Sequence, residues 1–411
     1  MGANVLLFCL IGFAWIDAGS VRLLPFEREA YGAVLGIFGL IVVLSLKRIS
    51  LRPLAAIFTI SWVTLSFIAL IQGLWGHGWE LSYLFGDFSV LMIPVLLFIA
   101  GNAGYPSIFA DRKALDAIGY GLIVAAGISF FFGRDVNLAG RYDPPNLFLA
   151  AWLMAKMLSA ITVRKAQGYS GLLMMFGAVA FLSNERTTVM IWACGVVVLL
   201  LSMRGKQIAQ LALPMVVLGL VGITSHFIFT SVDDGGFQSR FSKIEAGNDE
   251  SLQGRYNEVS DMFSTIDREW GPIDYIVGAG HGATFLPELS FPPRNVIGGR
   301  VHNIHIGPAL MFYRYGLMGI VGWLWWLIAM VASVRRAMSR DCPEVDRVII
   351  LSAGFVFLDS LMRNPFIDPI SCFSVAGLFH LFLGVNRARP MSFSGGSLEE
   401  GSLERSQAST P

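Results

Sequence analysis

Two histidines in an otherwise apolar chain are the residues best suited to acid–base chemistry. His302 and His305 lie where a long hydrophilic stretch meets a new apolar run, and their spacing of three places them on similar faces of any helix that begins there. Because imidazole titrates at about 6.5, either ring is a candidate general base; a structural hydrogen bond is the ordinary role for each. No HExxH sequence or Cys/His set accompanies them, so we expect neither a metal nor a cofactor.

Two arginines are candidates for binding an anion. Arg186 lies in a short polar segment, residues 183–188, between two apolar runs. Charge at membrane depth is costly unless it is paired or faces water, which makes Arg186 a functional candidate; the alternative is an interfacial residue of a tight turn. Arg255 is weaker taken alone, because a single arginine on an amphipathic helix is typical of a solvated face, with Glu258 as an ion-pair partner three residues on.

The remaining motifs favour ordinary structural roles or a different class of protein. The segment Gly278–Gly282 lacks the Lys and Ser/Thr of a phosphate-binding loop, which favours a tight turn. Three carboxylates, Asp17, Asp87 and Asp359, fall in or near apolar runs. Acidic residues in that setting are typical of proton paths, and they keep a transporter as an alternative.

The composition is that of a membrane protein. Of 411 residues, 55% are hydrophobic and 14% charged, whereas about a quarter of the residues of a soluble domain are charged. The net charge of +1 gives no field that would attract nucleic acid. The cysteines are scattered without CxxC spacing, which favours buried thiols over disulfides or a metal site; they are Cys9, Cys194, Cys342 and Cys372.

The apolar runs predict an all-α polytopic membrane protein with about twelve transmembrane helices. A helix needs roughly 20 apolar residues to cross a bilayer. The first run lacks a basic start and a cleavage site, so we expect a retained helix rather than a signal peptide. The runs cover about 5–16, 30–46, 53–74, 81–100, 115–132, 146–163, 170–184, 187–202, 208–229, 304–332, 347–362 and 368–385.

Basic residues predict the orientation and divide the chain into four parts. Lys and Arg gather in alternate short connections, near 47–52, 112–113, 164–165, 204–206, 335–347 and 387–389. The positive-inside rule places these connections and both termini in the cytoplasm. Residues 1–230 then form helices one to nine, 231–303 a long periplasmic loop, 304–385 helices ten to twelve, and 386–411 a disordered cytoplasmic tail.

The long loop itself is expected to contain an amphipathic helix. Its apolar residues recur at helical spacing between Leu252 and Ile266. Capping residues at 248–251 precede this run and Gly271-Pro272 follows it, which marks both ends of a helix. We expect the helix to rest on the membrane surface or on the outer ends of the spanning helices.

Several short motifs, in this order and topology, resemble bacterial O-antigen ligases and the related O-antigen and exopolysaccharide polymerases. The resemblance covers the architecture of the whole chain, and sequence motifs from about residue 140 onward. The motifs are Gly140-Arg141-Tyr142-Asp143-Pro144-Pro145-Asn146, Asn184-Glu185-Arg186-Thr187, Gly254-Arg255-Tyr256, Trp270-Gly271-Pro272, Gly278-Ala279-Gly280, His302-Asn303 and Tyr315-Gly316-Leu317-Met318-Gly319.

The resemblance implies metal-independent, inverting transfer of a glycan from an undecaprenyl-diphosphate carrier to a sugar hydroxyl, on the outer face of the bacterial inner membrane. It implies His302 as the base and Arg186 and Arg255 as diphosphate contacts. Further candidates for substrate binding are Asn303, Arg268 and His305. Since His305 stands near His302, the sequence leaves open which of the two is the base.

The acceptor also stays open on the sequence. A ligase, our leading interpretation, transfers the glycan to a sugar of the lipid A core, whereas a polymerase extends another lipid-linked glycan. Both interpretations require membrane lipids and a saccharide acceptor as partners, and neither requires nucleic acid. A transporter of lipid-linked sugar is the alternative from another class, but the chain lacks paired halves with matching broken helices.

Overall fold

The fold is helical throughout the part of the chain that the structure describes. The computed structural model describes residues 36, 39–40, 53–102, 109–132, 145–160, 162–182, 191–197, 250–289, 299–302, 304–339, 341–362 and 369–383. Within these ranges every regular element is a helix, and the pairing of Phe285 with Val301 is an isolated bridge. The predicted all-α fold is confirmed for this part of the chain.

Three of the described helices are long and apolar enough to cross a membrane. They are α3 (Pro53–Ile71) with its π-helical continuation η2 (Gln72–Gly76), α4 (Leu81–Asn102) and α13 (Gly307–Ala337). The other helices are α5 (Arg112–Phe132), α6 (Pro145–Ser159), α7 (Val163–Leu182), α11 (Glu250–Glu269), α12 (Asp274–Val277), α14 (Glu344–Ser360) and α15 (Pro369–Phe382).

A total of about twelve spans stays a prediction. The predicted helices at 5–16, 30–46, 187–202 and 208–229 lie wholly or partly outside the described residues, as does the predicted tail at 386–411.

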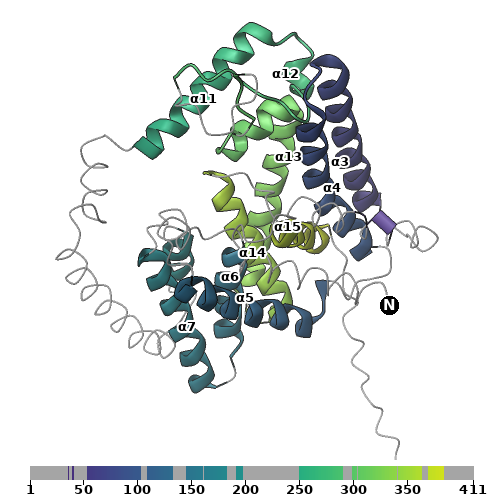
Figure 1. Ribbon diagram of the computed structural model, residues 1–411. Coiled ribbons are helices and arrows are strands. Elements are labelled where there is room, and N and C mark those ends of the chain that lie inside the picture. The colour runs from purple at the N-terminus through teal and green to yellow at the C-terminus, as the bar shows by residue number, and fades with distance from the viewer. Residues whose placement is uncertain are drawn as a thin grey trace, which may run out of the picture.

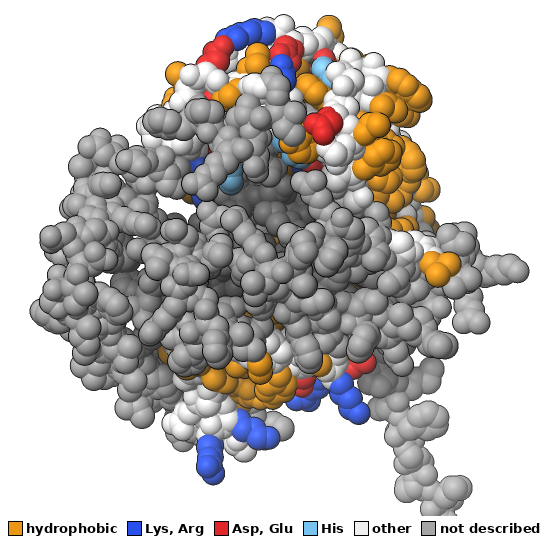
Figure 2. Space-filling model, in the orientation of Figure 1, with side chains coloured by type: hydrophobic (Ala, Val, Ile, Leu, Met, Phe, Trp, Pro, Cys, Tyr) orange, Lys and Arg blue, Asp and Glu red, His pale blue; other side chains and the backbone are white. Residues whose placement is uncertain are grey.

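The outward faces of α3 and α13 are apolar. Ile57 and Ile60 on α3 are more than half exposed, and so are Val321 and Val331 on α13. Contiguous exposed apolar surface of this kind marks contact with lipid or another protein, and on helices of spanning length it favours lipid. Figure 2 shows hydrophobic side chains gathered along one edge of the molecule, over α3 and α4, with charged side chains above and below.

The helices pack around a core rich in aromatic side chains. α14 packs against α6, α13 and α15, while α4 packs against α15 and α3 (Figure 1). The largest fully buried side chains include Trp152, Phe98, Phe373 and Phe379. Burying a large aromatic side chain contributes about 1.5–3 kcal/mol, so this core fixes α4, α6 and α15 relative to one another.

A charge cluster around a buried lysine joins three helices at the end of the bundle away from α11 (Figure 1). The ammonium group of Lys156 on α6, only 4% exposed, lies 2.6 Å from a carboxylate oxygen of Asp116 on α5 and 2.6 Å from one of Glu344 on α14. Arg112 pairs with the same two carboxylates, so the charges balance. Buried charge is tolerated when it is paired in this way, and the cluster holds α5, α6 and α14 together.

The predicted amphipathic helix is confirmed as α11, which ends just before Gly271-Pro272. Met262 and Ile266 on its inner face join a second, smaller apolar core with Phe285 and Tyr313. α11 therefore lies as a packed cap over one end of the spanning helices, close to α12 and α13 (Figure 1).

Candidate functional site

The candidate site forms where α4 and α13 begin, beneath the cap. Tyr83 and Asp87 are four residues apart on α4 and therefore project from the same face. Arg314 lies in the second turn of α13, and His302 lies just before that helix. Residues widely separated in sequence meet here because the chain between α12 and α13 folds back against α4.

A glycine turn supplies the local scaffold. Gly278, Gly280 and Gly282 have φ values of 77°, 85° and 76°, a region that side chains disfavour. The turn packs so closely that backbone groups of Ala279 and Gly280 donate to the carbonyls of Tyr313 and Arg314. The sequence prediction of a tight turn, rather than a phosphate-binding loop, agrees with this geometry.

Gly280→Ala is expected to lower the free energy of unfolding by about 3 kcal/mol, combining steric overlap with left-handed backbone strain. A Cβ atom at this position would lie 2.4 Å from the nitrogen of Gly73 and 2.5 Å from the oxygen of Ala69. The unfolding temperature in detergent measures the effect. The matched control is Gly254→Ala on α11, where a Cβ atom meets no other atom within 4 Å. Equal unfolding temperatures for the two variants would contradict the prediction.

His302, Asp87 and Arg314 form one hydrogen-bonded cluster. Nε2 of His302 lies 3.2 Å from Oδ2 of Asp87, and Nη1 of Arg314 lies 2.9 Å from Oδ1 of the same carboxylate. Nη2 of Arg314 is 3.3 Å from Nε2 of His302. The backbone N–H of Gly282 donates to Oδ2 of Asp87 over 2.8 Å, which ties the glycine turn to the cluster. We call these three side chains the His302 cluster.

Two kinds of contact orient the His302 ring: an aromatic ring stacks on its face, and polar groups contact its edge. The ring of Tyr83 stacks on it with centroids 4.1 Å apart and planes inclined by 15°. Nε2 makes both polar contacts of His302 within the described residues. It donates to Asp87 when it carries the proton and accepts from Arg314 when it does not, and in the tautomer protonated at Nε2 the lone pair lies on Nδ1. An imidazole held this way can accept a proton at Nδ1.

Burial makes the charges in the His302 cluster interdependent. The side chains of Asp87 and Arg314 are 8% and 5% exposed, whereas that of His302 is 16% exposed. The carboxylate and the guanidinium neutralise each other, so proton uptake by His302 would give the cluster a single positive charge. Nε of Arg314 is buried and makes no hydrogen bond within the described residues.

A second histidine, His281, is buried behind the cluster. Its Nε2 lies 3.4 Å from Oγ of Ser66, and its Nδ1 lies 3.5 Å from the hydroxyl of Tyr315. Its complete burial excludes direct contact with a substrate, and the sequence motif in which it lies is a structural one.

The other predicted site residues lie on the cap or outside the described residues. His305 is exposed and its Nδ1 lies 2.9 Å from Glu258, the residue that the sequence suggested as a partner for Arg255. Arg255 lies half-buried on α11. Arg268 forms a bidentate ion pair with Glu288 on the exposed side of the cap. Arg186 and Asn303 lie outside the described residues.

Two members of the site escaped sequence analysis, and a third was interpreted differently. Tyr83 and Arg314 lie within apolar runs and were not singled out. Asp87 was noticed as a carboxylate in an apolar run, but as part of a proton path. An arginine inside a predicted membrane helix is the signal that would have identified Arg314, because such a charge requires a buried counter-ion.

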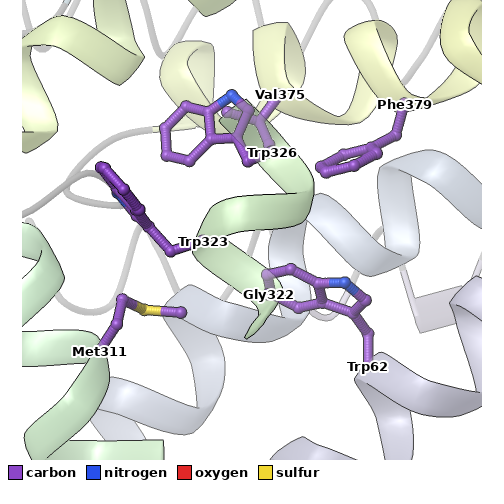
Figure 3. Close-up of a pocket in the computed structure, with 7 residues that line it drawn as sticks. All are labelled: Trp62, Met311, Gly322, Trp323, Trp326, Val375 and Phe379. Atoms are coloured by element: carbon purple, nitrogen blue, oxygen red, sulfur yellow. The ribbon is translucent and has the colours of Figure 1, made fainter. Parts of the chain in front are cut away.

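An apolar pocket lies deeper in the bundle, between α3, α13 and α15. Figure 3 shows the side chains of Trp62, Trp323, Trp326 and Phe379 around it. Met311 and Val375 complete the apolar lining. None of these side chains carries a charge, so the pocket offers no charged contact to a phosphate.

Comparison with known proteins gives no assignment: no protein-family profile matches this chain, and no curated protein matches it.

Proposed function

We propose that the chain is a glycosyltransferase of the O-antigen ligase kind in the bacterial inner membrane, with its site facing the periplasm. The observation that carries the proposal is the hydrogen-bonded His302 cluster, because it presents an oriented imidazole at one end of apolar helices of spanning length. The motif resemblance supplies the reaction class, and the cluster supplies a base suited to it.

The proposed reaction is a direct displacement. Nδ1 of His302 takes the proton of an acceptor hydroxyl as its oxygen attacks the anomeric carbon of the donor. The bond between that carbon and the diphosphate oxygen breaks, and undecaprenyl diphosphate leaves with the electron pair. The new glycosidic bond forms on the opposite face of the sugar, so the anomeric configuration inverts. Asp87 stabilises the imidazolium ion that forms on His302.

The leaving diphosphate needs cations, and Arg186 and Arg255 are the proposed contacts. A guanidinium group can donate two parallel hydrogen bonds to phosphate oxygens, and it keeps its charge at any physiological pH. Arg255 lies on α11, which caps the end of the helix bundle that carries His302. The cap is therefore the proposed source of the diphosphate contact on the outer side.

Arg186→Lys and Arg255→Lys are each expected to lower transfer by roughly 10–100-fold, because lysine retains the charge but loses the planar pair of donors. Initial rates with a lipid-linked donor measure the effect. The matched control is Arg164→Lys, at an exposed position in the first turn of α7, which should retain the rate of the unaltered chain. Full activity in both test variants would exclude bidentate phosphate contacts.

Reconstitution tests the function directly. The purified chain in vesicles is supplied with an undecaprenyl-diphosphate-linked glycan and a lipid A core acceptor. A new glycosidic bond to the core, with release of undecaprenyl diphosphate, is the expected result. Elongation of the lipid-linked glycan without the core acceptor would assign a polymerase instead. Movement of donor between leaflets without any new bond would assign a transporter and overturn the proposed chemistry.

A further inference from the structure

Segment 273–285 passes alongside the ends of three helices rather than over them. The backbone N–H of His281 donates to the carbonyl of Ala69 on α3 over 2.9 Å. The N–H of Gly282 reaches Asp87 on α4, and the N–H of Gly280 reaches the carbonyl of Arg314 on α13. Ala69 lies inside α3 and Asp87 inside α4, whereas Arg314 lies just before a kink in α13 at Gly316, whose φ of 59° and ψ of −149° are not helical.

The depth of the segment can be estimated from the rise of an α-helix, about 1.5 Å per residue. Ala69, whose carbonyl accepts from the backbone N–H of His281, precedes the last residue of its candidate span, Gly76, by seven residues, or roughly 10 Å. Asp87 lies six residues into α4, which gives roughly 9 Å. Two helices, α3 and α4, therefore place the glycine turn roughly 9–10 Å below their ends.

This depth lies within the hydrocarbon layer if α3 crosses the membrane. The candidate span Pro53–Gly76 has 24 residues and a length of roughly 36 Å, against a hydrocarbon core of about 30 Å. Even if the whole excess of roughly 6 Å projects at this end, the backbone contact of His281 with Ala69 lies about 4 Å inside the core.

The backbone of the segment meets the requirement for irregular structure at that depth. Non-helical backbone is tolerated within a membrane only where protein surrounds it and pairs its polar groups. Residues 278–285 are all buried. The four consecutive N–H groups from Ala279 to Gly282 donate to oxygens of Tyr313, Arg314, Ala69 and Asp87 respectively. The segment is thus built to lie away from water.

The first part of the segment, which contains α12, has an exposed apolar outer face. Ile273, Tyr275 and Ile276 are 61%, 46% and 55% exposed. The neighbouring Trp75 at the end of η2 is 76% exposed, and the side chain of Gln72 bonds Asp274 between the two elements. This apolar surface continues the outward face of α3, and Trp and Tyr are the residues enriched where protein meets the membrane interface.

We infer that residues 273–285 form a re-entrant element whose exposed face on α12 contacts the acyl chains and headgroups of the outer leaflet. The partner is the lipid bilayer itself, since α12 packs against α3, a helix of spanning length whose exposed side chains are also apolar. The re-entrant placement holds whichever reaction the chain catalyses. It also sets the His302 cluster below the membrane surface, where the headgroup of a lipid-linked substrate lies.

Site-directed spin labelling in vesicles of phosphatidylethanolamine and phosphatidylglycerol tests this placement. Single cysteines replace Ile273 and Ile276 in a chain whose native cysteines are changed to alanine. Power saturation compares collisions with oxygen, which concentrates in lipid, and with a nickel chelate, which stays in water. Position 60 on α3 is the lipid-exposed control, and position 256 on α11, 68% exposed in the cap, is the water-exposed control.

Labels at 273 and 276 are expected to collide more with oxygen than with the nickel chelate, as at position 60. The label at position 256 is expected to show the reverse preference. Preference for the nickel chelate at both test positions would overturn the inference. If the cysteine-free chain fails to fold, benzoylphenylalanine at 276 in the otherwise unaltered chain replaces the labels. Phospholipid adducts after irradiation, absent when the probe is at 256, would support lipid contact; equal yields at the two positions would exclude it. Neither readout depends on transferase activity.

Discussion

Replacing His302 by alanine is expected to lower the rate of glycan transfer by about 10²–10⁴-fold, the usual contribution of a general base. Asp87 keeps its ion pair with Arg314 and its hydrogen bond from the backbone of Gly282, so removal of the imidazole should leave the helix bundle folded. Binding of the lipid-linked donor is expected to persist because the proposed diphosphate contacts are arginines. Single-turnover transfer and donor binding, measured separately, distinguish the loss of a base from the loss of a site.

His305→Ala is the matched control for the base. The side chain of His305 is 55% exposed and bonds to Glu258 on the cap, so its loss should reduce transfer only slightly. Normal turnover by His302→Ala together with an inactive His305→Ala would move the base by three residues. Full activity in both variants would exclude the proposed mechanism. Added chelator should leave the unaltered chain active, because the proposed displacement requires no metal.

The helices were predictable because their signals are local. Apolar runs predicted α3, α4 and α13 to within a few residues at most ends, since a segment of spanning length needs little help from the rest of the chain. α11 was predicted from its apolar period and from the Gly271-Pro272 stop, which act within one or two turns. α13 ends at Ala337 rather than at the predicted residue 332, because Arg335 and Arg336 continue the helix beyond the apolar run.

The site was only partly predictable because its central contact is not local. His302 was identified from its place at the end of a hydrophilic stretch. Its partner Asp87 lies 215 residues away, and a lone carboxylate in an apolar run carries no indication of which residue will neutralise it. Arg314 could have been recognised as a charge inside a predicted membrane helix, but the sequence does not indicate that Asp87 is its partner. Only the packing of the glycine turn against α4 and α13 brings the three side chains together.

Asp87→Asn is expected to lower transfer by about 10²–10⁴-fold, comparable to the loss of the base, because Asp87 positions His302 rather than touching substrate. The amide cannot stabilise an imidazolium ion, and it allows the ring to adopt the other tautomer. The same change leaves the guanidinium of Arg314, 5% exposed, without its counter-ion. An unpaired buried charge costs about 3–5 kcal/mol, so the single variant is expected to be unstable as well as inactive.

The double variant Asp87→Asn/Arg314→Gln separates these two effects. Removing both charges eliminates the uncompensated guanidinium, so the unfolding temperature should return close to that of the unaltered chain. Transfer should stay low, because His302 still lacks the carboxylate that orients it. In a chain that already carries His302→Ala, Asp87→Asn/Arg314→Gln should reduce transfer little further, since residues that act as a unit are not additive. Recovery of transfer along with stability would give Asp87 a purely structural role, and His302 would then act without a positioning carboxylate.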